Sequence, residues 1–425
     1  MAGLIGVIFG AQLAIAAPQS SNPCESLPLE QVTSQAPPYG LDALARRAVE
    51  THASVAAKRA NVDAARAEWD AARRQYLPAP SAQTSPGAGG GHSTVLTLEQ
   101  PLWSGGRLSA SVDAALARSR SADLGVLESQ QGLGLAVANV YRAFLQARGR
   151  AMVLQQFIGR LDNYHESMRR RVDSGASAQG DLELLQARYA LTNGQLKSAC
   201  FAERSARHQL SLLVGVELSS AEVVGTPQVP EVPDLEDLLE RSEKSSPTLR
   251  RMDQDTLAAR GEADAKVAAQ WPTVALVAQR TLPRGVPNVS SSTAVGLQLQ
   301  YTPGAGFASL ARARSAEAQV EALRASREAA RVDLLSKVHA EHEDLCSAVS
   351  RRQDALLNLK ATANVLASFE RLFAVGKRSW LDVMNAAREL SDAEQALADI
   401  EAQMSPGRYR LALYGVELDW MESAQ

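Results

Sequence analysis

Three side chains of types that bind transition metals lie close together in the second half of the sequence. His339, His342 and Cys346 are spaced so that one helical face would carry all three, with Glu343 beside them. Imidazole and thiolate groups are ligands for zinc or copper. Three ligands on one straight helix rarely converge, however, and a second helix would have to complete the site. A polar contact between two helices is the alternative, and we favour it over a metal site.

No enzyme motif accompanies this cluster. The chain has no HExxH, no Walker A sequence and no Gly-x-Ser-x-Gly. The glycine-rich stretch 87–91 follows Pro86 rather than a strand, which argues against a phosphate-binding loop. Charge is nearly balanced, with 44 Lys and Arg against 47 Asp and Glu, and this excludes a strongly basic nucleic-acid-binding protein. We therefore expect no catalytic residues, no cofactor and no nucleic-acid partner.

Composition favours long helices packed side by side. Apolar residues make up 45% of the 425 residues, but aromatic residues only 5%, which is few for large compact cores. The cysteines Cys24, Cys200 and Cys346 form no CxxC pair, so we expect neither a disulfide framework nor a zinc module.

The N-terminal residues have the character of a targeting segment. Residues 1–17 are apolar and end in small residues, as in a secretory signal peptide, although no Lys or Arg precedes them. We expect residues 18–40 to form an extended segment. Cys24 follows Ser-Asn-Pro, which is not the context of a lipid-modified cysteine, so we expect it to be unmodified. Beyond residue 20 there is no apolar run of about 18 residues, so we expect no transmembrane helix.

The sequence contains an internal duplication. Residues 41–44 (LDAL) match residues 235–238 (LEDL), and GVEL at 215–218 recurs at 415–418. Proline and glycine positions between these blocks match in the same order, as in Pro78 with Pro272, Gly106 with Gly306, and Gly175 with Gly376. We therefore expect two structural repeats, over residues 41–224 and 235–418, joined by a linker over 225–234 and followed by a tail over 419–425.

Each repeat is expected to contain the same elements in the same order. A first helix would end before a proline that cannot continue it, and strands, a very long helix, a glycine-containing turn and a return helix would follow. The expected ranges are helices 41–76 and 235–271, strands at about 79–103 and 273–301, long helices at about 107–173 and 307–375, and return helices to about 215 and 415.

The long helices have the pattern of coiled coils. A helix over 107–173 would extend roughly 100 Å. Apolar residues recur along it at four-three spacing from Leu133 to Val172, and less regularly from Leu335 to Leu366 in the second repeat. Narrow apolar stripes of this kind predict lateral packing of many helices into an α-barrel, with polar faces toward water.

The strand segments have the alternation of membrane β-strands. Apolar residues alternate with small or polar ones over 293–301, and Tyr301 stands where an interfacial aromatic residue is expected. Leucines alternate similarly over 96–102, and Trp103 occupies a girdle position. Residues 273–281 suit a partner strand, whereas 79–91 alternates poorly, which leaves the fourth strand open. The expected membrane-facing residues are Leu96, Leu98, Leu102, Trp103, Val295, Leu297, Leu299 and Tyr301. A soluble hairpin packed on helices is the alternative.

Four strands cannot close a barrel, and open sheet edges cannot face lipid. Two copies would give eight strands and an interior filled by side chains, whereas three would give twelve and leave a lumen. A pore of this kind therefore requires a homotrimer.

These features together resemble the TolC-like family of outer-membrane efflux and secretion ducts. The resemblance is carried by LEQPLWSGGR at 98–107 and by the turns at 172–182 and 373–383. It implies a homotrimer with a small β-barrel in the lipid of the outer membrane. A helical tunnel would project into the periplasm and dock on an inner-membrane transporter and its periplasmic adaptor, a membrane fusion protein.

The resemblance also assigns the two turns to the periplasmic tip and pore constriction. It implies an aromatic residue at Phe373, a latching arginine at Arg378 and an acidic ring at Asp382, while Asn385 stands where a second carboxylate is common. The expected tip residues are Gly175, Asp181, Phe373, Gly376, Arg378, Asp382 and Asn385. Three Asp382 carboxylates on one axis would attract cations. Alternatively Asp382 only caps the returning helix, which is the function we expect for Asp181.

Two classes of function remain. A passive export duct is favoured, because both repeats carry their own strands, whereas a periplasmic coiled-coil adaptor or scaffold without a barrel would normally have one helical hairpin. Type I protein secretion, drug efflux and metal efflux share this body plan, so the sequence leaves the transported substrate open.

Overall fold

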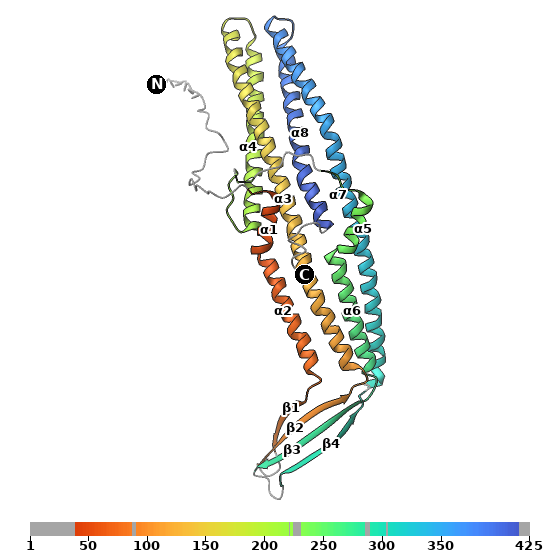
Figure 1. Cartoon of the computed structure of the whole chain (residues 1–425). Coiled ribbons are helices and arrows are strands. Elements are labelled where there is room, and N and C mark those ends of the chain that lie inside the picture. The colour runs from red at the N-terminus through yellow and green to blue at the C-terminus, as the bar shows by residue number, and fades with distance from the viewer. Residues whose placement is uncertain are drawn as a thin grey trace, which may run out of the picture.

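The computed structural model describes residues 39–86, 91–220, 222–223, 231–284, 290–302 and 305–415. The segment 1–17, nearly all of 18–40, most of the linker and the tail 419–425 lie outside the described residues. The chain is an elongated rod with a four-stranded sheet at one end and two helix–helix turns at the other (Figure 1).

Two helices of 67 residues each run along most of the rod. They are α3, Arg107–Asp173, and α7, Ala308–Ala374, the latter preceded by the short 3₁₀ helix η1, Ala305–Phe307. Each turns back into a shorter helix, α4 (Gln179–Val214) or α8 (Trp380–Tyr414). Helix α3 packs against α4, α6 and α8, so it lies at the centre of the bundle.

The first helix of each repeat is split in two, whereas the sequence predicted one helix over 41–76 and one over 235–271. The observed helices are α1 (Leu41–Thr51), α2 (Ala53–Arg74), α5 (Leu235–Ser245) and α6 (Pro247–Ala268). His52 is extended at the first break, and its ring accepts a hydrogen bond from the Ser54 N–H. At the second break the hydroxyl of Ser246 accepts from the Leu249 N–H, and Pro247 follows at the first helical position. Local capping thus ends a helix that the apolar pattern alone would continue.

The sheet contains two strands from each repeat in the order β1-β2-β3-β4, all antiparallel. The strands are β1 (Ala79–Pro86), β2 (His92–Trp103), β3 (Thr273–Arg284) and β4 (Ser292–Gln300). The strand that the sequence left open is therefore present as β1. Because β2 and β3 pair across the two repeats, the sheet needs both of them.

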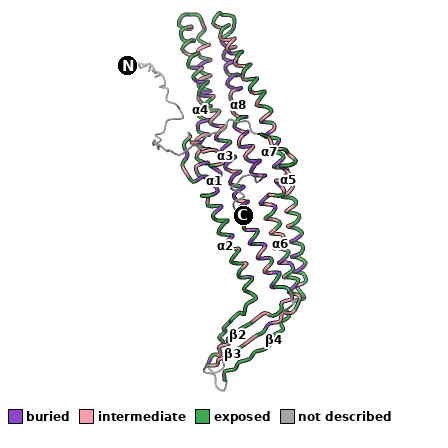
Figure 2. Tube along the Cα trace, in the orientation of Figure 1, coloured by how far each residue is buried: buried purple, intermediate pink, exposed green. Residues whose placement is uncertain are grey.

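Buried side chains form separate clusters along the rod rather than one central core. Figure 2 shows buried residues along the helix faces, while the tip turns and most of the sheet are exposed. The largest cluster, around Tyr141 and Phe144, lies where α1, α3 and α4 meet, and another, around Leu161 and Met384, lies near the tip. None of the helices in the described part of the chain is long and apolar enough to cross a membrane. The expected fold class is confirmed: a mainly helical chain with long helices, four antiparallel strands and two repeats.

Candidate functional sites at the helical tip and the sheet

Both turns at the helical tip have the same backbone geometry. Gly175 and Gly376 each adopt a φ of 74°, a left-handed conformation that favours glycine. The N–H of Gly175 donates to the carbonyl of Val172, and that of Gly376 to the carbonyl of Phe373. Each long helix therefore ends two residues before its glycine, and the return helix begins four residues after it.

Asp382 caps helix α8. Its N–H donates to the Ser379 hydroxyl, and its carboxylate accepts from both the N–H and the hydroxyl of Ser379. Arg378 forms an ion pair with this carboxylate, with its Nη1 3.8 Å from Oδ2 of Asp382. The hydrogen bonds from Ser379, and secondarily the charge of Arg378, hold the pKa of Asp382 below its usual range. The carboxylate is therefore held in its charged form at the tip.

Asp181 does not form the corresponding cap. Helix α4 has Ala178 at its N-cap position and no side-chain capping hydrogen bond. Ala178 stands in the first repeat where Ser379 stands in the second, and it lacks the hydroxyl that completes the capping box. The expectation that Asp181 caps its helix is therefore wrong, although its carboxylate still lies in the first turn, where the helix dipole favours negative charge.

The aromatic and arginine residues of the tip stack in two separate pairs. Arg378 lies over the ring of Phe369, with Cζ 4.5 Å from the centroid, and Arg171 lies over Phe373 at 4.6 Å. Phe373 also contacts Trp380, with ring centroids 5.3 Å apart. Asn385 lies one turn beyond Asp382 and is half-buried.

Sequence reasoning missed the residues that join the two hairpins. Trp380 is 5% exposed, and its ring packs edge-on against Tyr164, with centroids 5.5 Å apart. The Tyr164 hydroxyl donates to the carboxylate of Glu370, which links α3 to α7. Burial, and then the bond to Glu370, raises the pKa of Tyr164, so the tyrosine stays protonated. The one available signal was the position of Trp380, immediately after the capping serine.

One face of the sheet is mainly apolar across three strands, and Gln100 and Arg280 are the polar residues that share it with the apolar set on β2 and β3. Leu98 of β2 pairs with Ala278 of β3, which pairs in turn with Val295 of β4. Since directly paired residues share a face, the register gathers both repeats' apolar residues on that side. They are Leu96, Leu98, Val274, Leu276, Ala278, Val295, Leu297 and Leu299. The opposite face carries Thr97, Glu99, Gln279, Gln298 and Gln300. In the single chain all five members of this set on β2 and β4 are exposed, and so is Leu276 of β3.

A β-bulge changes the end of β2. The sequence predicted that Leu102 continues the apolar alternation, but the register shifts between Pro101 and Trp103. Trp103 pairs with Val274, so it takes the place on the apolar face that Leu102 was expected to occupy.

Four aromatic residues lie at the junctions between helices and sheet. Tyr76 follows α2, Trp103 ends β2, Trp271 precedes β3, and Tyr301 follows β4. All are about half exposed, from 46% for Tyr76 to 60% for Trp271. Sequence reasoning identified Trp103 and Tyr301 but missed their counterparts, because Tyr76 and Trp271 were assigned to the ends of helices.

The histidine–cysteine cluster is not assembled as a metal site. His342 is buried, and its Nε2 lies 3.1 Å from the carbonyl oxygen of Pro233, whereas His339 is exposed. The Cys346 sulfur lies 3.7 Å from Nδ1 of His342. Within the described ranges no group of three or more His, Cys, Asp or Glu could hold a metal ion. His342 instead makes a polar contact with the segment that precedes α5.

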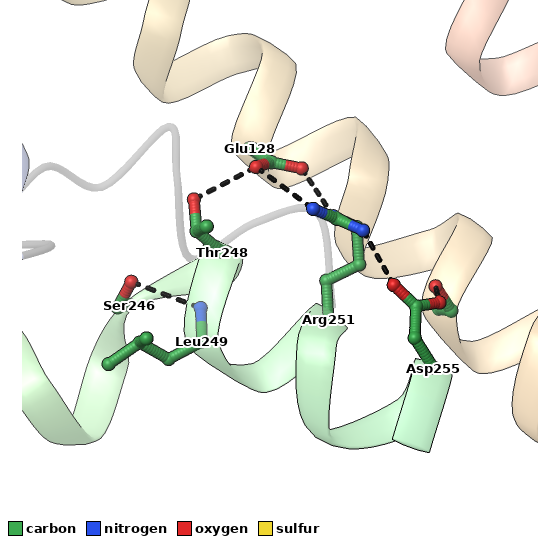
Figure 3. Close-up of polar contacts among 7 residues, drawn as sticks. Glu128, Ser246, Thr248, Leu249, Arg251 and Asp255 are labelled. Atoms are coloured by element: carbon green, nitrogen blue, oxygen red, sulfur yellow. Dashed lines mark hydrogen bonds and ion pairs between the residues drawn. The ribbon is translucent and has the colours of Figure 1, made fainter. Parts of the chain in front are cut away.

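A polar network joins the two repeats beside the break between α5 and α6. Figure 3 shows Arg251 of α6 between Glu128 of α3 and Asp255 of its own helix. Nε of Arg251 lies 2.5 Å from Glu128, and Nη1 lies 2.6 Å from Asp255. Thr248 also donates to Glu128. The network links the start of α6 to the first long helix, α3.

The comparisons with known proteins agree with this architecture. The family model described as outer membrane efflux protein matches residues 44–216 and 238–414, one match for each repeat. The chain belongs to the outer membrane efflux protein family. It is an outer-membrane efflux channel, and the members of this family are channels rather than enzymes.

Solved structures of such channels share the fold. The outer-membrane channel OprN is 20% identical, covers 90% of each chain and has a TM-score of 0.79. CusC is 18% identical over 94% of this chain and 99% of its own, with a TM-score of 0.77. MtrE of Neisseria gonorrhoeae is 18% identical over 88% of each chain, with a TM-score of 0.71. No curated protein gives a significant sequence match. The resemblance to TolC-like ducts is thus confirmed, and family membership implies a trimer with efflux-pump partners.

Proposed function

We propose that three copies of this chain form one passive channel, with a twelve-stranded barrel in the outer membrane and a tunnel of helices in the periplasm. Its partners would be an inner-membrane transporter and a periplasmic adaptor, which supply the energy and the substrate. The substrate would be a small molecule, as the name of the family suggests, or a protein in type I secretion.

The observation that carries this proposal is the sheet. It has one apolar and one polar face, and its outer strands β1 and β4 each have one edge without a partner within the described chain. An edge strand in lipid must be paired, because unpaired backbone groups cost several kcal/mol each there (about 2–7). Pairing β4 of one copy with β1 of the next satisfies both edges and turns the apolar faces outward.

The tip would form the entrance on the periplasmic side. Around a threefold axis, Asp382 would supply three carboxylates, each kept charged by Ser379. Arg378 and Phe373 lie close enough to take part in closing this end. The half-buried Asn385 would stand one turn deeper without adding charge.

The test uses two neighbouring residues of β4 that lie on opposite faces. Leu297 is on the apolar face and Gln298 on the polar face. Leu297→Arg should prevent assembly in the outer membrane, because an arginine on the lipid face costs about 2–4 kcal/mol near the bilayer midplane and three copies would carry it. Gln298→Arg, the matched control, should still give a heat-modifiable trimer and should change only its conductance in planar bilayers.

Equal behaviour of the two variants would contradict the proposal. A soluble, elongated monomer that needs no detergent would instead support the adaptor or scaffold without a barrel.

A further inference from the structure

A charged side chain shares the mainly apolar face of the sheet. Arg280 of β3 pairs with Leu96 of β2 and with Thr293 of β4. It lies two residues beyond Ala278 on a strand without a register shift there, so both side chains point to the same face. In the proposed channel, on which this inference rests, that face meets lipid. An arginine in such a place is costly unless a partner compensates its charge.

The guanidinium of Arg280 has no hydrogen-bond or ion-pair partner among the described residues. Gln100, a polar residue on the same face, is satisfied by the chain itself, because its Nε2 donates to the carbonyls of Tyr76 and Pro101. Arg280 is exposed as well as unpaired. Its guanidinium is therefore open to a ligand that approaches the sheet from the outside of the barrel.

The strands of a neighbouring copy offer no carboxylate to Arg280 either. Residues 77–104 and 272–306 include all four strands and their connections, and their sequence contains a single acid, Glu99. Glu99 lies on the opposite face, where it pairs with Ala79 and Val277. The counter-charge for the arginine therefore has to come from a molecule other than this chain.

Two further basic side chains extend this face toward the end of the sheet that lies away from the helices (Figure 1). Arg284, the last residue of β3, lies four residues beyond Arg280 and pairs with His92, the first residue of β2. Within strands β1 to β4 as the structure describes them, these three are the only basic residues. All three lie on one face and Glu99 on the other, a distribution that favours anions on the outside of the barrel.

Position along β3 indicates how deep these groups would lie in a membrane. Six residues separate Arg280 from Val274, which pairs with Trp103 at the junction with the helices. They correspond to about 20 Å of strand and, at the tilt of membrane strands, to about 15 Å of height. Arg284 lies about 10 Å higher, near the top of an apolar band that is about 25 Å tall. Arg280 would thus lie below the headgroups of the outer leaflet, and its flexible stem lets the guanidinium extend toward them.

A hollow in the sheet adjoins the arginine, and we call it the Arg280 hollow. Its volume is about 490 Å³, and its lining includes Pro80, Ala82, Leu96, Leu98, Ala278 and Arg280. These residues all belong to the apolar-face rows, and the lining residue on β4 is Thr293, which lies on that face, rather than Ala294, which points the other way. Small side chains at Ala82 and Ala278 leave space between the leucines for part of a hydrocarbon chain.

We propose that Arg280 binds a phosphate group of an outer-leaflet lipid and that an acyl chain of the same lipid lies in the Arg280 hollow. Guanidinium and phosphate form strong, often bidentate, charge-assisted hydrogen bonds. The hydroxyl of Thr293 supplies a second donor on the neighbouring strand, and Arg284 and His92 contact the outer part of the headgroup. A trimer carries three such sites around its barrel, one for each copy.

The site is tested by native mass spectrometry of the detergent-purified, delipidated trimer, with lipid A that carries two phosphates as the probe. We expect up to three bound lipids per native trimer and roughly tenfold weaker binding by Arg280→Gln, which should assemble normally because it removes a charge from the lipid face. The matched control is Gln279→Arg combined with Arg280→Gln, which keeps the net charge but moves the arginine to the opposite face. It should bind lipid A as weakly as Arg280→Gln.

Two measurements on the native trimer separate a lipid from a free anion. Lipid A stripped of its phosphates should bind roughly tenfold more weakly than the phosphorylated lipid, and millimolar inorganic phosphate should not displace the latter, because the hollow also holds its acyl chain. Equal binding by the native protein and the two variants, equal binding of both lipids, or displacement by phosphate would overturn the lipid site and leave the trimeric channel intact. A chain that stays monomeric without detergent would overturn the channel, and the lipid site with it.

Discussion

The guanidinium of Arg171 lies over the ring of Phe373, 4.6 Å from its centroid, and so joins the end of α3 to the end of α7. Phe373 in turn contacts Trp380, the first residue of α8. The cluster around these rings includes Leu161 of α3 and Leu185 of α4, so it draws on all four helices that reach the tip. The two turns of one chain therefore form one packed unit.

Trp380 should determine the stability of this unit. Trp380→Ala removes a large, 95% buried ring, and a core change of this kind costs about 3–5 kcal/mol. We expect a lower melting temperature and faster proteolysis at the two tip turns. Leu381→Ala is the matched control, because Leu381 is 54% exposed, and it should change neither measurement. If both variants behaved alike, the tip would not be held together by the Trp380 cluster.

A buried ion pair should stabilise the contact between α7 and α8. Arg410 is 6% exposed, and its Nε and Nη2 donate to Glu341 at 2.8 and 2.7 Å. Glu341→Gln should lower the free energy of unfolding by about 3–5 kcal/mol, because it leaves the arginine charge buried without compensation. The pair of changes Glu341→Leu and Arg410→Met should recover much of this loss.

The control for the ion pair is Asp333→Asn on the same helix. Asp333 pairs with Lys337, but both side chains are about 60% exposed, so we expect a change below about 1 kcal/mol. Thermal or denaturant unfolding of the purified protein measures all of these variants. If Glu341→Gln lowered the free energy of unfolding as little as Asp333→Asn, the ion pair between Glu341 and Arg410 would not stabilise the contact between α7 and α8.

The overall fold was predictable because it depends on periodic and repeated signals. Prolines 78 and 272 and the glycines of the two turns mark helix ends in both repeats. The four-three spacing of apolar residues recurs over many helical turns, so it identifies the long helices even where a short stretch alone would be ambiguous. The break at His52 was not predictable, because an apolar helical pattern continues through it and only a side-chain contact to Ser54 ends the helix. The bulge before Trp103 was not predictable either, because it depends on the pairing of β2 with β3, a strand far away in the sequence.

The tip was predictable only in part. Its turns and the cap at Asp382 are local, since Ser379 and Asp382 lie three residues apart. The pairs Arg171–Phe373 and Tyr164–Trp380 join different repeats, and no spacing within one repeat indicates them. The missing cap at Asp181 could have been anticipated, because Ala178 replaces the serine.

A close crossing between α3 and α6 should tolerate only glycine at position 261. A Cβ built on Gly261 would lie 2.9 Å from the carbonyl oxygen of Ala110 and from the Cβ of Ala114. Gly261→Ala should therefore push the helices apart and destabilise the protein by about 1–3 kcal/mol, despite the better helix propensity of alanine. Gly132→Ala is the control, because nothing lies within 4 Å of its Cβ position, and it should not reduce the melting temperature. Equal changes in melting temperature for the two variants would show that α3 and α6 can move apart at little cost to accommodate a Cβ at position 261.

The hydrogen bonds of the capping box should also set the pH range over which the tip binds cations. The bonds from Ser379 depress the pKa of Asp382, so the cap and the negative charge are fully present above the ordinary pKa of aspartate, about 4, and are lost only as the pH falls through the lower folded value. Asp181 lacks such bonds.

We therefore expect Asp382→Ala to raise single-channel conductance or weaken block by multivalent cations in planar bilayers, because three converging carboxylates would be lost. Asp181→Ala should have little effect, since its carboxylate is not part of the proposed ring. Ser379→Ala should retain the block at neutral pH. As the pH is lowered, this variant should lose the block at a higher pH than the native channel does, because Asp382 then protonates nearer its ordinary pKa. Unchanged block in Asp382→Ala would remove the ring assignment and leave Asp382 as a helix cap alone. If Ser379→Ala and the native channel lost cation block at the same pH, the capping hydrogen bonds would not control the charge of Asp382 at the entrance.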